Sequence, residues 1–72
     1  MSQVVYLKVL APGGEYRGVL IPLPAIPRIG DRLALYHVEG IPTGQYDVDN
    51  VVWEYNAKKG QETVIVVYVS PL

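Results

Sequence analysis

The segment of residues 63–69 constrains this chain more than any other, because it is a run of β-branched and aromatic residues without a charge. Such residues favour extended strands, and an uncharged strand with open edges pairs readily with other strands. The segment must therefore be paired along its edges and covered on at least one face. Its partners come either from the rest of the chain or from another copy.

Length and cysteine content predict one small β domain over residues 1–72 that needs help to be stable. A chain of 72 residues buries only about 60% of the surface that it exposes when unfolded. Cysteine is absent and His37 is the only histidine, so we expect no disulfide, no metal and no cofactor. Self-association is the remaining common source of stability, and we expect a homo-oligomer.

Composition and charge place the chain in the globular class. Half of the residues are hydrophobic and the net charge is −1, which gives no long-range attraction to nucleic acid or to an anionic membrane. No apolar run approaches the roughly 18 residues that span a bilayer, and no positive segment precedes the first apolar residues. We expect a cytoplasmic protein with no membrane partner.

Gly and Pro clusters separate stretches that alternate in hydrophobicity, which is the pattern of strands and turns. The first two strands should form a hairpin, and the last two should form another through a turn at residues 56–60 closed by a left-handed glycine. Gly18 suggests a bulge or a close backbone approach. Alternation predicts five strands, at residues 3–10, 15–21, 32–38, 45–55 and 63–69.

Two segments interrupt this alternation. In the fourth strand, Tyr46 and Val48 have the opposite parity to Val51 and Trp53, which predicts a solvated bulge within residues 47–50 rather than a cation site. The prolines of residues 22–30 exclude a helix or a central strand, so this segment should be an extended lid. It contains P-x-x-P followed by arginine, which we interpret as a structural crossing rather than as a peptide ligand.

The predicted fold is all-β: a five-stranded, mostly antiparallel small barrel or a curled sheet. Five short strands, a proline-rich crossing and a Gly-Asp entry to the third strand resemble the Src-homology-3-like barrels, and the oligonucleotide-binding fold is the alternative. Residues 27–55, with P-x-x-G-D-x-hydrophobic, Y-x-V and V-x-W patterns, also resemble short uncharacterised bacterial and phage β-proteins. That resemblance implies no activity and no ligand.

The expected core comes from the inward positions of these strands. His37 alternates with Leu33 and Leu35, so we expect a partly packed strand histidine rather than a catalytic base. Catalysis by a serine or cysteine nucleophile is not expected, because cysteine is absent and the serines lie only at positions 2 and 70. We therefore expect a protein that is not an enzyme. The predicted core residues are Val5, Leu7, Val9, Val19, Ile21, Leu33, Leu35, Val51, Trp53, Ile65, Val67 and Val69.

The aromatic residues carry the functional hypotheses. The chain has six tyrosines and Trp53 but no phenylalanine, and tyrosine suits half-exposed positions at interfaces. The first hypothesis is a self-associating or protein-binding module with Val64, Val66 and Tyr68 at the interface. The alternative is a barrel that binds single-stranded nucleic acid by base stacking, although basic residues are not in excess. Its face would contain Tyr6, Tyr16, Tyr36, Arg17 and Arg32.

Overall fold

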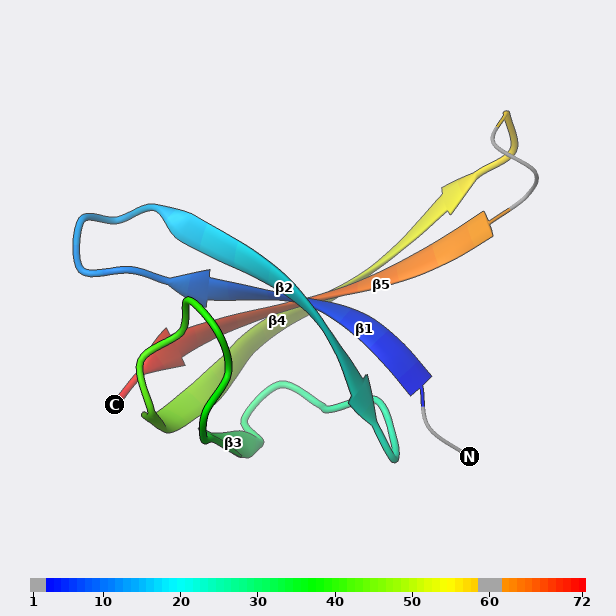
Figure 1. Ribbon diagram of the computed structural model, residues 1–72. Coiled ribbons are helices and arrows are strands. Elements are labelled where there is room, and N and C mark those ends of the chain that lie inside the picture. The colour runs from blue at the N-terminus through cyan, green and yellow to red at the C-terminus, as the bar shows by residue number, and fades with distance from the viewer. Residues whose placement is uncertain (1–2, 59–61) are drawn as a thin grey trace.

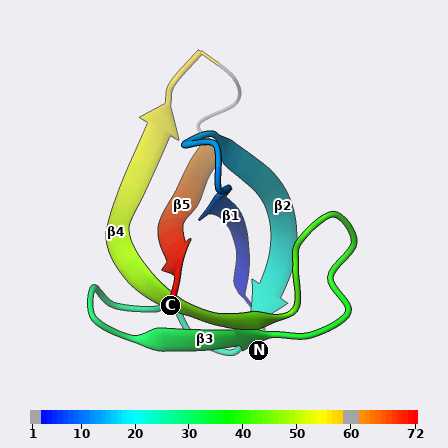
Figure 2. The same ribbon diagram turned by 90° about the vertical axis from the view of Figure 1, so that its left-hand side faces the viewer.

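The computed structural model describes residues 3–58 and 62–72, which form five strands in one curled sheet (Figure 1). Seen end-on, the sheet bends into a half-barrel (Figure 2). No helix is present in the described residues, which confirms the all-β prediction. The strands are β1 (Gln3–Leu10), β2 (Tyr16–Leu23), β3 (Arg32–Leu35), β4 (Gly44–Asn56) and β5 (Glu62–Pro71).

The strand order is β2-β1-β5-β4-β3. The β1–β2, β3–β4 and β4–β5 pairs are antiparallel, so both predicted hairpins are present. The β1–β5 pair is parallel and joins residues 6–9 to residues 66–69. Within the uncharged segment, residues 66–69 are therefore paired on both edges within one chain, whereas residues 63–65 pair with β4 on one edge. In the predicted turn between β4 and β5, the Lys58 amide donates to Asn56 Oδ1 at 3.0 Å. Gly60, which was predicted to close this turn in the left-handed conformation, lies outside the described residues.

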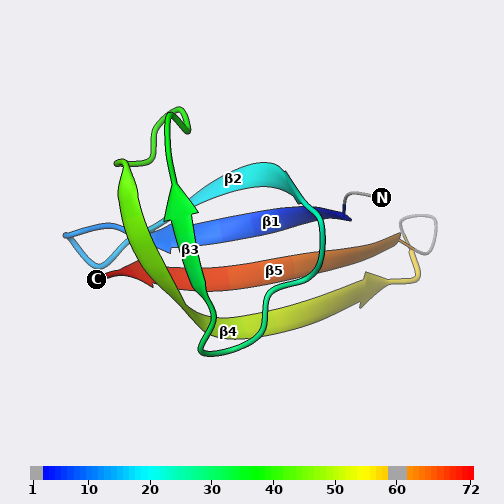
Figure 3. The same cartoon turned by 90° about the horizontal axis from the view of Figure 1, so that it is seen from below.

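The core lies on the concave inner face of the sheet, which carries Val5, Leu7 and Val9. Residues 24–31 and β3 cross this face (Figure 3), and Ile26 packs against the core as expected for a lid. Ile29, in contrast, is 67% exposed. The buried cluster consists of Val5, Leu7, Val9, Leu35, Ile41, Tyr46, Val48, Ile65, Val67 and Val69.

The predicted bulge in β4 is present. The β4–β5 register shifts between Val48 and Asn50, which leaves exposed Asp49 as the extra residue. Because one residue is inserted, Tyr46 and Val48 before it and Val51 after it all belong to or pack on the core. Tyr46 and Val48 are therefore core residues that the predicted list lacked.

Strands β2 to β5 differ from their predicted bounds, and the differences in β2 and β3 alter the interpretation of Pro22 and His37. Strand β2 continues through Pro22 and Leu23, because it is an edge strand and proline is tolerated where no ladder hydrogen bond is required. Strand β3 ends at Leu35. His37 lies in the following loop, is exposed and has a φ of 55°, so the prediction of a strand histidine is wrong.

The ends of β4 and β5 form an arm, defined here as residues 53–56 and 62–65. Strand β1 pairs with β5 only from Val66 onward, and in Figure 1 the arm diverges from β1 and β2. Trp53 pairs with the core residue Ile65 across the arm but is 61% exposed. The prediction of Trp53 as a core residue is wrong, because no other strand of the described residues covers the arm at this position.

We expect Trp53→Ala to lower the free energy of unfolding by less than about 1 kcal/mol, as for other exposed side chains. Leu7→Ala should lower it by about 2–5 kcal/mol, because Leu7 is fully buried. Urea denaturation of both variants measures this difference. Trp53 is the only tryptophan, so quenching of its fluorescence by acrylamide is an independent check. A shielded Trp53 in the monomer, or a large loss of stability in Trp53→Ala, would contradict the exposed position.

Candidate interaction face

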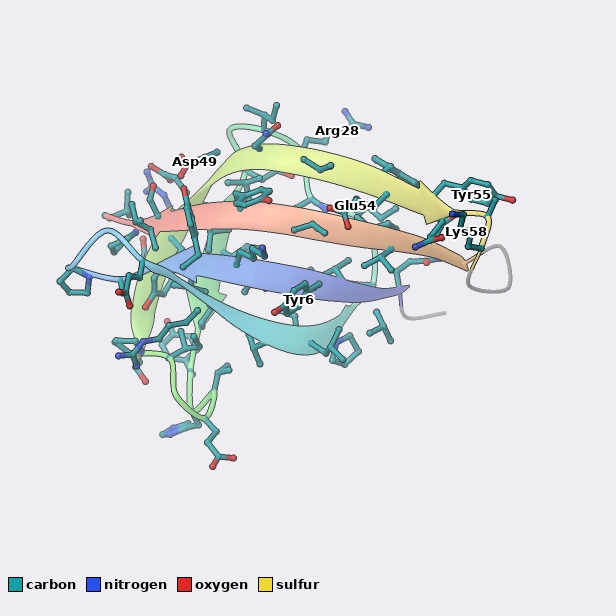
Figure 4. The ribbon with its side chains drawn as sticks, turned by 90° about the horizontal axis from the view of Figure 1, so that it is seen from above. Tyr6, Arg28, Asp49, Glu54, Tyr55 and Lys58 are labelled. Carbon is teal, nitrogen blue, oxygen red and sulfur yellow. The ribbon has the colours of Figure 1, made fainter. Side chains whose placement is uncertain are left out.

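The outer face of the sheet carries the side chains that alternate with the core residues on β1, β2, β4 and β5. Figure 4 looks onto this face, with the four strands side by side and Tyr6 and Glu54 labelled on it. The crossing segment and β3 lie behind the sheet in this view. The outer face is therefore uncovered by the described part of the chain.

Strand register arranges the outer face in rows across the sheet. One row contains Leu20, Tyr6, Val66 and Val52 from β2, β1, β5 and β4. The next row contains Gly18, Lys8, Tyr68 and Asn50 in the same strand order. Most of the candidate residues from the sequence therefore lie on one surface.

The middle of the outer face is closed by its own side chains. Val66 is only 2% exposed, and its cross-strand neighbours Tyr6 and Val52 are half-buried. The Tyr6 ring lies over Gly18, where an added Cβ would overlap the ring. The β1–β2 register is unbroken at Gly18, so this glycine marks a close approach and not a bulge.

Beside this closed centre lies an aromatic cluster around Lys8. The Lys8 ammonium is 5.8 Å from the Tyr6 ring centroid and 5.7 Å from that of Tyr68, within the range of cation–π attraction. Tyr16 meets Tyr68 edge to face, with centroids 5.3 Å apart, which is a favourable arrangement of two rings. Three strands thus contribute to one cluster of tyrosines with a single cation.

A second group of apolar side chains on the outer face is exposed. We call it the aliphatic rim, and its members are Val4, Leu20, Pro22 and Val64. Val4 is 61%, Leu20 67% and Val64 40% exposed. Single exposed apolar residues are common on protein surfaces, whereas a group on one sheet face is typical of a contact surface.

The three residues predicted at an interface all lie on the outer face of β5, but they differ in exposure. Val64 is exposed, Tyr68 is half-buried and Val66 is buried. A lysine at position 66 would bury a charge within the monomer, which costs several kcal/mol. A partner can therefore reach Val64, and the exposed part of Tyr68, without rearrangement of the monomer, whereas Val66 is closed to it.

The predicted nucleic-acid face is divided between separate surfaces. Tyr6 and Tyr16 lie on the outer face, whereas the Arg17 guanidinium donates to the Gly40 carbonyl at 3.2 Å in the β3–β4 loop. Arg32 forms an exposed ion pair with Asp47 at 3.3 Å, and Tyr36 is exposed after the end of β3. On the outer face, Tyr6 and Tyr16 instead lie near Lys8 and Tyr68, which the predicted nucleic-acid face did not include.

Side chains that could bind a metal ion do not gather in residues 3–58 and 62–72. No group of three or more His, Asp or Glu side chains is placed to hold a metal ion there. A helix long and apolar enough to cross a bilayer is likewise missing from these residues.

Comparison with protein-family models, curated proteins and solved structures finds no match for this chain. The resemblances to Src-homology-3-like barrels and to short bacterial and phage proteins stay predictions. The candidate face therefore rests on its own geometry.

We expect Gly18→Ala to lower the free energy of unfolding by about 1 kcal/mol, because the new methyl group must displace the Tyr6 ring from its half-buried position. Gly13→Ala is the matched control, since an added Cβ there meets no atom within 4 Å and its φ is not positive. That variant should be neutral or stabilised by about 0.5 kcal/mol. Urea denaturation compares the two. Equal stability of both variants would contradict the packing of Tyr6 over Gly18.

Proposed function

We propose that this chain is a non-catalytic interaction module that binds a second copy of itself through the outer face of its sheet. The observation that supports this proposal is the aliphatic rim, which exposes apolar side chains from β1, β2 and β5 on one uncovered surface. Burying such side chains is favourable by about 25 cal/mol per Å² of apolar area removed from water. The same face would meet itself across a two-fold axis, as in most homodimers.

The charge distribution favours a like partner over a strongly charged one. Two charged residues lie beside the apolar and aromatic side chains of the outer face. They are Lys8, whose ammonium lies near two tyrosine rings, and Glu54, which pairs with Val64. Cores of protein interfaces are depleted in charge and enriched in tyrosine. Because each copy carries a net charge of only −1, two copies repel each other weakly.

The small size of the domain gives a thermodynamic reason for association. The chain has no cysteine and so no disulfide, and its described residues bury one core cluster on the inner side of the sheet. Association through the opposite face would bury apolar surface that folding of the monomer leaves in water. A partner that binds only the folded state also stabilises that state by mass action.

We expect Leu20→Lys to shift the chain from dimer to monomer, because it places a charge in the aliphatic rim at a position where lysine does not disturb the monomer core. Ile29→Lys is the matched control: Ile29 has the same 67% exposure as Leu20 but lies on the crossing segment. Molar mass from light scattering during size-exclusion chromatography measures the outcome. The control should stay dimeric at the concentration where Leu20→Lys is monomeric.

Two results would contradict this proposal. A wild-type chain that is monomeric up to millimolar concentration would remove self-association through any surface. An oligomer that survives Leu20→Lys and Val64→Lys but dissociates in Ile29→Lys would place the interface elsewhere. Urea denaturation of each variant distinguishes lost association from lost folding.

A second candidate function, the binding of single-stranded nucleic acid, is supported by the aromatic cluster around Lys8. Tyr6, Tyr16 and Tyr68 lie on one surface with a cation among them, and sheet aromatics of this kind stack on unpaired bases. The counter-argument is that Arg17 and Arg32 are engaged elsewhere. Absorbance at 260 and 280 nm in the same chromatography run detects co-eluting nucleic acid, which should dissociate at high salt if it is bound through phosphates.

A further inference from the structure

A groove of about 520 Å³ lies at the end of the half-barrel where the β1–β2 turn, the β3–β4 loop and residues 71–72 come together. The apolar part of its wall includes Val9, Leu10, Ile41, Pro42, Tyr46 and Leu72. Figure 1 shows these segments at the end of the molecule opposite the arm. The volume falls within the roughly 300–1,000 Å³ that is typical of small-molecule sites.

Arg17 is the one charged side chain among the described residues that line this groove. It pairs with Val9 across the β1–β2 ladder, so strand alternation directs it to the inner side of the sheet. Its Nη1 donates to the Gly40 carbonyl at 3.2 Å, which uses one of the five N–H donors of a guanidinium. Within the part of the chain that the structure describes, no carboxylate lies within 4 Å of Arg17.

The loop on the other side of the groove is held in place before any ligand binds. The Ile41 amide donates to the Val38 carbonyl at 3.1 Å, and the Tyr46 hydroxyl donates to the Pro42 carbonyl. Gly40 has a φ of 80°, a conformation that glycine adopts without strain. The loop that Arg17 contacts is therefore already ordered before a ligand binds. This lowers the entropic cost of ligand binding.

We propose that this groove binds a small carboxylic acid with an apolar body, such as a medium-chain aliphatic acid. The carboxylate meets the free N–H donors of Arg17, and the hydrocarbon chain lies against Leu10, Ile41 and Tyr46. A guanidinium with no carboxylate within 4 Å of it favours an anion over a cation or a neutral molecule. The apolar wall selects an anion with a hydrophobic body over an inorganic ion.

This site is independent of the proposed self-association. Arg17 and Val9 are inner-face residues, whereas the aliphatic rim lies on the outer face. Loss of ligand binding and loss of dimer formation can therefore be measured separately in the same variants.

The test is a titration of the full chain with octanoate, octanol and octylamine, followed by backbone amide chemical shifts. Octanoate and octylamine are kept below their critical micelle concentrations and octanol below its solubility limit. We expect octanoate to shift the amides of Leu10, Ile41 and Leu72 and to bind about three- to tenfold more tightly than octanol. This ratio is the net contribution of one ordinary hydrogen bond, because solvent at the groove weakens the effect of the charge. Octylamine should bind more weakly than octanol, because it is repelled by Arg17.

Arg17→Gln should remove the preference for octanoate over octanol and leave octanol binding unchanged. Arg28→Gln is the matched control, because Arg28 is exposed and lies outside the groove. The proposal is overturned if octanoate and octanol bind wild type equally, if Arg17→Gln keeps the preference, or if the shifts map to Val4, Leu20 and Val64. If Arg17→Gln does not fold, the salt dependence of binding to the wild type tests the same point. Added salt must weaken the binding of octanoate and leave the binding of octanol unchanged.

Discussion

The parallel pairing of β1 with β5 is the interaction on which the rest of this structure depends. Among the described residues it is the only pairing that connects the β1–β2 hairpin to the β3–β4–β5 meander. It places Leu7 beside Val67 and Val9 beside Val69 in the buried core. The pairing covers four residues of each strand, although both strands are longer. Beyond these four residues, the arm of β4 and β5 diverges from β1 and β2 (Figure 1). Among the described residues, Trp53 on the arm therefore has no covering strand.

Features of the fold that depend on neighbouring residues were predictable from the sequence. The first strand has the predicted bounds, and the change of parity between Val48 and Val51 correctly indicated a bulge. Features that depend on distant residues were not predictable in the same way. Alternation assigned Trp53 to the inner side of the sheet, but whether another strand covers that side depends on how far β1 and β5 remain paired. His37 was misplaced because a loop with a positive φ can follow a strand without any Gly or Pro at that position.

The candidate surface was predicted in part, and for similar reasons. Parity on β5 placed Val64, Val66 and Tyr68 on one face, as the structure has them. It could not reveal that Val66 is buried there, since this depends on Tyr6 and Val52 from two other strands. Tyr16 and Arg17 are adjacent in β2 and therefore lie on opposite faces, so one strand could not supply both to the predicted nucleic-acid face.

The choice of tyrosine connects the fold to the proposed interface. A phenylalanine at position 6 could also cover Gly18, but a tyrosine ring that is half-buried keeps its hydroxyl in water while its body closes the centre of the outer face. The exposed apolar side chains then lie around this closed centre, on Val4, Leu20 and Val64. An approaching copy would meet these aliphatic groups first, and their burial would supply the hydrophobic part of the binding energy. The tyrosines would contribute ring contacts and hydrogen bonds that need no change in the monomer.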